Sequence, residues 1–253
     1  MAANQRERDI LEAARNALRA EPQLGPDYSP QRLELQQDGA LLVEGEVPGV
    51  AEKKRCLVRL GAIDGVAAIV DRLRVRPAQE MGDEQIRARL SRFFAQEPSF
   101  QSFGVRAMEY ETTDPVYRQI FEPVVGTETG TRGRIDIEVR DGVVTLNGHV
   151  PTLHDKRLAG VMAWWVPGVR DVIDGLTVEP GEEDGPVRIE EAVRSALEKD
   201  PYVDASQVRV GVRGREVRLT GELNSETLRD MAECDAWYVF GVNNVIDEIE
   251  VRP

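Results

Sequence analysis

The residues best suited to metal binding or nucleophilic chemistry are few in this chain of 253 residues, and their spacing favours neither role. His149 and His154 are the two histidines, and no cysteine or carboxylate cluster accompanies them at the spacing of a metal site. Cys56 and Cys234 lack the cationic neighbours at a helix start that would activate a thiol, so we expect small, buried cysteines. We therefore expect no catalytic, cofactor-binding or metal-binding residue, and no enzyme activity.

Two adjacent pairs of aromatic residues are more informative. Trp164-Trp165 and Trp237-Tyr238 stand near the ends of two stretches with helical periodicity. Neighbouring positions on a helix point about 100° apart, so both members of a pair cannot enter one buried stripe. We expect one aromatic of each pair to pack in its own core and the other to face outward.

The elements that position these aromatics belong to a threefold repeat. A glycine that ends a strand-like run is followed, 20 residues later, by a second glycine and a valine, and this occurs three times, at Gly45/Gly65, Gly148/Gly168 and Gly221/Gly241. Each second glycine opens an alternating run that ends in a final strand, such as Leu73/Val75 in the first segment. Equal spacing at three places indicates three copies of one structural unit.

Each copy predicts the order helix, strand, strand, helix, strand. The first helices end at Glu21-Pro22, Glu97-Pro98 and Asp200-Pro201, because proline lacks the donor that a helix needs. Thr152 and Ser225 are expected N-caps of second helices. The predicted fold is α+β: three tandem αββαβ segments, each a three-stranded mixed sheet with two helices on one face. The segments span residues 1–78, 79–180 and 181–253, and the stretch 180–186 is expected to be a polar hinge.

This pattern resembles the BON domain family, in which a glycine ends the second strand and Gly-Val-x-x-Val-x-Asn/Asp-x-Leu/Ile-x-Val follows about 20 residues later. The resemblance implies association with membranes, lipids or the bacterial cell envelope, usually without catalysis. It also implies that Trp164 and Trp237 are structural, because the family often has tryptophan at this position. Trp165 and Tyr238 are then the candidates for an interaction surface: packing between segments, which we favour, dimerisation, or docking at a bilayer.

The second segment is longer than the others by about 27 to 30 residues, which we place near 104–133. Tyr110, Tyr117 and Phe121 in this insertion indicate packing, and we expect a short helix over 115–121. The insertion could be a ligand lid, a cover for an open sheet edge or a subunit contact, with a homo-oligomer as one outcome. Because the other segments manage without it, we expect the core of the second segment to be complete without residues 104–133.

Charge and hydropathy narrow the range of partners. The net charge of −13 disfavours nucleic acid and anionic lipid, and it is divided as 0, −5 and −8 over the three segments, so the first segment is the most compatible with a membrane. The polar N-terminus has no apolar run of a signal peptide, which predicts the cytoplasm. We expect a non-enzymatic, stress- or envelope-related interaction protein that binds phospholipid surfaces or partner proteins. The alternative is a cytoplasmic sensor of a small ligand or a cation such as potassium.

Overall fold

The computed structural model describes the backbone of residues 2–113, 116–126 and 132–252, and the side chains of residues 5–108, 122–126 and 132–252. The chain divides into two compact units, Met1–Arg76 and Pro77–Pro253. Among the helices described, none is both long enough and apolar enough to cross a membrane.

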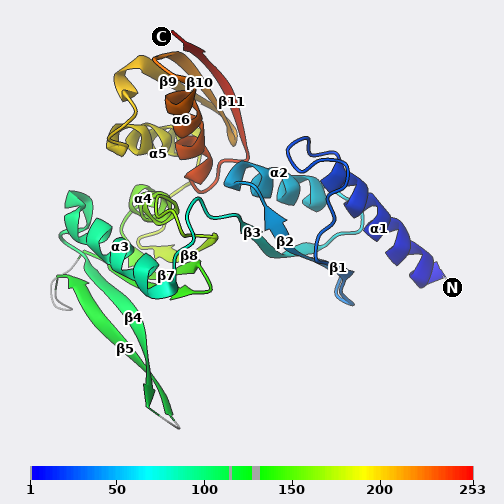
Figure 1. Cartoon of the computed structure of the whole chain (residues 1–253), viewed down its shortest axis with the longest axis horizontal. Coiled ribbons are helices and arrows are strands. Elements are labelled where there is room, and N and C mark those ends of the chain that lie inside the picture. The colour runs from blue at the N-terminus through cyan, green and yellow to red at the C-terminus, as the bar shows by residue number, and fades with distance from the viewer. Residues whose placement is uncertain (1, 114–115, 127–131, 253) are drawn as a thin grey trace. The chain divides into compact units, whose positions relative to one another are not determined.

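The unit Met1–Arg76 holds one mixed sheet and two helices (Figure 1). Its elements are α1 (Ala2–Arg19), β1 (Arg32–Leu35), β2 (Ala40–Val47), α2 (Val50–Gly61) and β3 (Ala68–Val75). Strand β2 is central, antiparallel to β1 and parallel to β3. Ile10, Ala14 and Leu18 recur at helical spacing and form the buried stripe of α1, while Leu41 and Val43 are the fully buried side chains of β2. The order and the three-stranded mixed sheet agree with the sequence-based prediction for this segment.

The unit Pro77–Pro253 holds two sheets. Its elements are α3 (Asp83–Gln96), η1 (Pro98–Phe100), β4 (Gly104–Thr113), β5 (Val116–Val125), β6 (Arg134–Arg140), β7 (Val143–Val150), α4 (Leu153–Trp164), β8 (Asp171–Val178), α5 (Pro186–Lys199), η2 (Ala205–Gln207), β9 (Val208–Arg213), β10 (Glu216–Leu223), α6 (Glu226–Tyr238) and β11 (Asn244–Val251). The strand orders are β5-β4-β6-β7-β8 and β11-β10-β9. In both sheets an antiparallel pair is followed by a helical crossover to a parallel strand, β8 or β11. The predicted α+β class is confirmed.

The secondary structure predicted for the insertion is wrong in two respects. The second segment has a five-stranded sheet, not a three-stranded one, because the insertion supplies β4 and β5. Residues 115–121 were expected to form a short helix, but residues 116–125 form strand β5, as their content of Val, Ile, Tyr and Phe favours. Strand β4 pairs in parallel with β6 over Gly104–Ala107, so the insertion covers the sheet edge that β1 and β9 leave open in the other two sheets.

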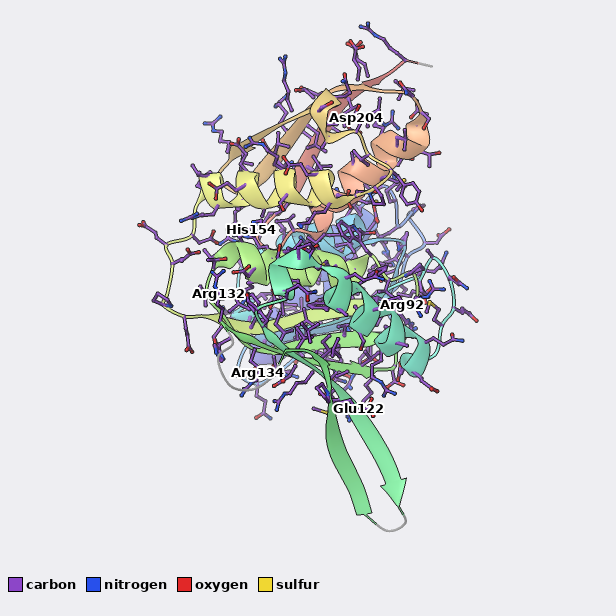
Figure 2. All side chains as sticks on the ribbon, turned by 90° about the vertical axis from the view of Figure 1, so that its left-hand side faces the viewer. Arg92, Glu122, Arg132, Arg134, His154 and Asp204 are labelled. Carbon is purple, nitrogen blue, oxygen red and sulfur yellow. The ribbon has the colours of Figure 1, made fainter. Side chains whose placement is uncertain are left out.

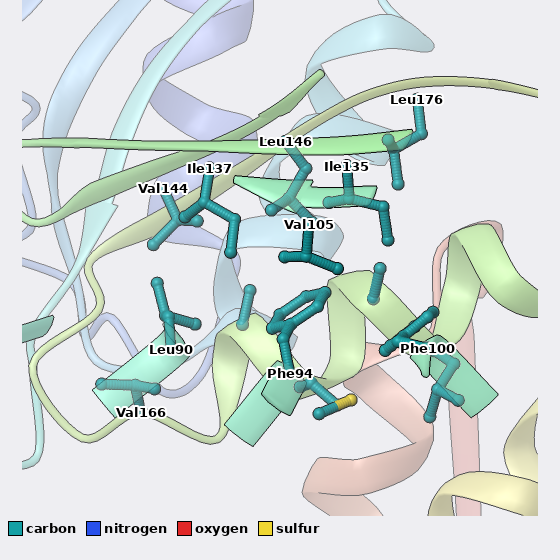
Figure 3. Close-up of a cluster of buried hydrophobic side chains, with 14 of the residues drawn as sticks. Leu90, Phe94, Phe100, Val105, Ile135, Ile137, Val144, Leu146, Val166 and Leu176 are labelled. Atoms are coloured by element: carbon teal, nitrogen blue, oxygen red, sulfur yellow. The ribbon is translucent and has the colours of Figure 1, made fainter. Parts of the chain in front are cut away.

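The base of this hairpin belongs to the core. Val105 is fully buried beside Ile135 and Ile137, and on the other side of the cluster Leu90 and Phe94 of α3 point toward the sheet (Figure 3). Phe94 also stacks on Phe100 with ring centroids 5.0 Å apart. The expectation that the core is complete without residues 104–133 is therefore wrong for the first residues of the insertion. Beyond them, the hairpin projects from the sheet (Figure 1).

The local signals at helix and strand ends are confirmed where the structure describes them. The Thr152 hydroxyl accepts from the Asp155 amide, and the Ser225 hydroxyl accepts from the Leu228 amide, so both residues are N-caps. Gly148 has a φ of 121°, and a Cβ there would collide with the Arg134 carbonyl across the ladder. The strand-ending glycine is thus required by the close approach of two backbones.

We predict that the projecting part of the hairpin is dispensable for folding. Replacing residues 109–120 with Asn-Gly joins Met108 to Phe121, which are already cross-strand partners, through a favoured two-residue turn. The free energy of unfolding in urea should change by about 0.5 kcal/mol or less, because loop length affects closure entropy only slowly. The contrasting variant Val105→Ala should cost roughly 2 kcal/mol, since it opens a cavity in the core. Loss of cooperative unfolding in the shortened variant would show that the whole hairpin is part of the core.

Candidate functional site

A polar clasp between the second helix and the last strand recurs in all three sheets. In each case a basic side chain on the helix pairs with an aspartate on the strand: Lys53 with Asp71 at 3.0 Å, Lys156 with Asp174 at 3.9 Å and Arg229 with Asp247 at 3.4 Å. The same aspartates accept from the backbone amide two residues further on. Burial raises the pKa of Asp174 to about 6, although Lys156 acts in the opposite direction. The clasp therefore locks the crossover helix to its sheet, which is a structural role.

A second buried cation joins the second and third segments. The side chain of Arg157 on α4 is 0% exposed, and its Nε donates to the Phe240 carbonyl at 2.8 Å. Its Nη2 donates to Asp184 Oδ1 at 2.7 Å. Burial raises the pKa of Asp184, but the hydrogen bond and charge of Arg157 outweigh it, so this pKa lies below its ordinary value. Because Asp184 precedes α5 and Phe240 follows α6, one guanidinium fixes both ends of the third segment's helical layer to α4.

Aromatic side chains complete this contact between α4 and α6. The indole Nε1 of Trp165, at the C-cap of α4, donates to Asp235 Oδ1 at 2.8 Å. Trp164 stacks on Tyr238 with centroids 5.9 Å apart and an interplanar angle of 11°. We call Arg157, Trp164, Trp165, Asp235 and Tyr238 the α4–α6 seam. It is a built interface within Pro77–Pro253, with hydrogen bonds, a buried charge and stacked rings.

The seam brings together two of the candidate interaction residues. Trp165 and Tyr238 both lie in it, where they contact residues of the neighbouring segment. Trp164 was assigned to the core of its own segment; it packs against that core, but it is only partly buried and also stacks on Tyr238. Trp237, in contrast, is buried, and its Nε1 donates to Glu233 at 3.0 Å. The pairing of one core aromatic with one outward aromatic therefore describes Trp237-Tyr238 but not Trp164-Trp165.

The remaining candidates lie on the insertion. Tyr110, Tyr117 and Phe121 have their backbones in β4 and β5, and their side chains lie outside the described part of the chain. Their proposed contact roles stay predictions.

One of the two cysteines differs from the expectation in its burial. Cys56 is buried, and burial raises the pKa of its thiol to about 12, but Cys234 is exposed, so the expectation of two buried cysteines is wrong for α6. His154 stands in the first turn of α4 (Figure 2). It lines a hollow of about 520 Å³. Within the described residues no group of three or more His, Cys, Asp or Glu side chains could hold a metal ion. In that hollow Glu182 accepts from the Leu153 amide at 2.8 Å, which caps α4.

Sequence reasoning missed the seam residues Arg157 and Asp235, and also Asp184, the carboxylate partner of Arg157. The stretch 180–186 was expected to be a hinge, yet it is anchored at Asp184 by Arg157 and at Glu182 by α4. A signal for Asp235 was available, because it stands six residues before Gly241 just as Arg59 stands six before Gly65. A change from base to acid at a matched helical position marks a different contact in the third segment.

One protein family model matches two stretches of the unit Pro77–Pro253. The family model of the BON domain matches residues 128–180 and 187–253. These two segments are BON domain matches. They cover β6 to β8 and α5 to β11, so the BON resemblance of residues 1–76 rests on the sequence repeat.

Other known proteins add little. No curated protein matches the chain. Two solved structures of CdsD, a structural protein of the type III secretion system of Chlamydia trachomatis, align with 97% of this chain and with 93% and 98% of their own, at 15% identity and a TM-score of 0.24. The second of these is described as the C-terminal domain. At that TM-score the likeness bears on neither the fold nor the function of this chain.

We predict an asymmetry between the two partners of the buried ion pair. Asp184→Asn should lower the free energy of unfolding by about 3 kcal/mol, because it leaves the Arg157 charge buried without its carboxylate. Arg157→Met should cost less, since Asp184 is about a third exposed and stays hydrated. Urea unfolding followed by tryptophan fluorescence reports on this unit, because all three tryptophans, at 164, 165 and 237, lie in it.

The matched control for that pair is an exposed ion pair of the same kind. Arg218 contacts Glu248 on the sheet surface, with side chains 51% and 48% exposed. Arg218→Met should change the free energy of unfolding by about 0.5 kcal/mol or less. Equal effects of Asp184→Asn and Arg218→Met on the free energy of unfolding would contradict a buried ion pair between Arg157 and Asp184.

Proposed function

We propose that this chain is a non-enzymatic interaction protein made of three tandem BON-like segments, 1–78, 79–180 and 181–253, with a cytoplasmic location and a stress- or envelope-related role. Support for the tandem repeat comes from the matched glycines and from the helix–strand clasp that all three sheets contain. Support for binding rather than catalysis comes from the BON domain matches, since this family is associated with phospholipid or protein binding.

The observation that favours a protein partner is the internal use of the seam aromatics. Trp165 and Tyr238 were candidates for docking at a bilayer, but they contact Asp235 and Trp164 within the unit Pro77–Pro253. Aromatic side chains that already pack and hydrogen-bond at an internal seam are not free to anchor a membrane interface. A surface that binds a partner must therefore lie on elements outside the α4–α6 seam.

The outer faces of the sheets are also poorly suited to anionic lipid. In each sheet an arginine in or just after a strand pairs with an acid of the neighbouring strand: Arg76 with Glu46 at 3.0 Å, Arg106 with Asp136 at 2.7 Å and Arg252 with Glu222 at 3.1 Å. Pairing of this kind neutralises the positive charge that would draw a protein to phospholipid headgroups. Together with the net charge of −13, it favours a protein surface over an anionic membrane.

The projecting hairpin is the element best suited to bind such a partner. Strand β4 pairs with β6 over only Gly104–Ala107, whereas its ladder with β5 continues to the pair Thr113 and Val116. Strand β5 is the outermost strand of its sheet among the residues that the structure describes. Unpaired strand edges accept an added strand through backbone hydrogen bonds. We therefore place the partner contact at the β4–β5 hairpin (Figure 1).

The sensor remains a second candidate because of one hollow on the third sheet. It has a volume of about 620 Å³ and is lined by oxygen-bearing side chains, among them Ser206, Thr220, Glu222 and Glu248. Oxygen ligands suit hard cations. However, Glu222 and Glu248 are each paired with an arginine, Arg252 and Arg218, which lowers the negative charge available to a cation.

Site-specific photo-crosslinking tests the proposal. Glu122 is exposed where the hairpin leaves the sheet (Figure 2), and Asp230 is an exposed residue on α6 that serves as the control position. A photo-crosslinking residue at Glu122 should give a discrete protein adduct in the native cells, and the same residue at Asp230 should not.

The competing functions predict different results. Co-sedimentation with neutral or anionic phospholipid vesicles would favour the membrane reading, and a rise in the thermal midpoint with potassium alone would favour the sensor. Either result, without a protein adduct at Glu122, would contradict a protein partner.

A further inference from the structure

Two carboxyl groups are buried side by side at the seam. Asp235 on α6 is 2% exposed and Asp200, the C-cap of α5, is 8% exposed. Asp200 is close enough to raise the pKa of Asp235, so the two carboxyls are near neighbours. Asp235 Oδ1 accepts from Trp165, and Asp200 Oδ1 accepts from the Tyr202 amide at 2.8 Å. Asp235 Oδ2 is buried and has no hydrogen-bond donor among the residues that the structure describes.

The first segment has an acid and a base at the two matching positions. Glu21, which like Asp200 precedes a helix-ending proline, is 2% exposed and faces Arg55 at 3.1 Å and Arg59 at 3.4 Å. Asp235 stands at the repeat position of Arg59. Where the first segment has an acid and a base, the third therefore has two acids, and two adjacent buried carboxylates cannot both be charged without a large cost.

Within the described part of the chain, no cation is among the groups that shift the pKa of Asp235. Lys199 on α5 is bonded to Glu97 at 2.7 Å, and Glu233 on α6 accepts from Trp237. Cys234 and Tyr238 are the other titratable neighbours on α6. From α4 the facing group is Trp165, an uncharged donor. A proton on Asp235 Oδ2, donated to Asp200, satisfies the orphaned oxygen and removes one charge.

We propose that Asp200 and Asp235 form a proton-held latch, in which one shared proton keeps α6 seated against α4 and α5 and its loss at alkaline pH loosens the α4–α6 seam. In agreement with this, burial raises the pKa of Asp235 to about 8, with Trp165 acting to lower it and Asp200 to raise it. The ordinary value for aspartate is about 4. The folded state therefore holds one proton more than the unfolded state between these values.

The sign of the effect follows from that proton. Because the folded-state pKa is raised, the stabilisation is complete below about pH 4 and is lost as the pH rises to about 8, with no further loss above it. Over that window the unfolding equilibrium constant should gain about tenfold per pH unit from this site. Asp235→Asn keeps an acceptor for Trp165 and a donor for Asp200 without the titration. The pH dependence of the unfolding equilibrium constant of the wild type, minus that of Asp235→Asn, should therefore give the contribution of the shared proton.

The experiment compares urea unfolding of the full chain from pH 5 to pH 10 for the wild type, Asp235→Asn and the control Asp230→Asn. Asp230 is an exposed acid on the same helix, and its variant should keep the wild-type slope. The carboxyl ¹³C shift of Asp235 in the wild type should titrate near pH 8, and this readout does not depend on any variant folding.

Two further variants should move that midpoint in opposite directions. Trp165→Phe removes a donor that favours the charged carboxylate, so the midpoint should rise. Asp200→Asn removes the neighbouring charge, so the midpoint should fall. A purely structural role would move neither midpoint. A wild-type midpoint below about pH 5, or equal pH slopes for Asp235→Asn and Asp230→Asn, would overturn the latch.

Discussion

The buried guanidinium of Arg157 is the contact on which the arrangement of residues 77–253 depends. A charged group that is 0% exposed must find its partners inside the protein, and Arg157 takes one from the linker before α5 and one from the turn after α6. Gly241 follows that turn, and a Cβ there would stand 3.2 Å from Nη2 of Arg157. Phe240 and Asp184 bind Nε and Nη2 of this guanidinium from the two ends of the third segment's helical layer, which restricts how that layer packs on α4. The seam aromatics then pack between helices whose relative position Arg157 already restricts.

A second principle operates inside each segment. The aspartate of the final strand, Asp71 in the first segment, accepts from its own strand two residues on and faces a base on the crossover helix, Lys53. This explains why the motif after the second glycine carries Asp or Asn: a short side chain with an oxygen is needed to turn back on the strand. The clasp is local to a segment and recurs three times, whereas the seam is made once. Residues that recur in all three segments thus stabilise each segment, and residues that differ between segments form the contact between the second and third segments.

The sequence predicted what depends on local chemistry. Proline pairs, N-caps and the glycine of each second strand act within a few residues or one ladder, and the structure places them as expected. The hairpin was missed because Pro123 interrupts β5, where the ladder shifts register beside Arg106, and because its parallel partner β6 is distant in the chain. The seam was missed for a related reason. Periodicity shows that a residue is buried but not which distant residue it meets, although the exchange of Arg59 for Asp235 between repeats was visible.

We infer that the second and third segments form one rigid body held at the α4–α6 seam. Backbone residual dipolar couplings of the full chain test it most directly, because they report the orientation of each sheet in a common frame. We predict that one alignment tensor fits the couplings of β6–β8 and β9–β11 together, at pH 6, with the sheets oriented as in this structure. Two tensors of different magnitude would show independent motion of the sheets and would contradict the claim.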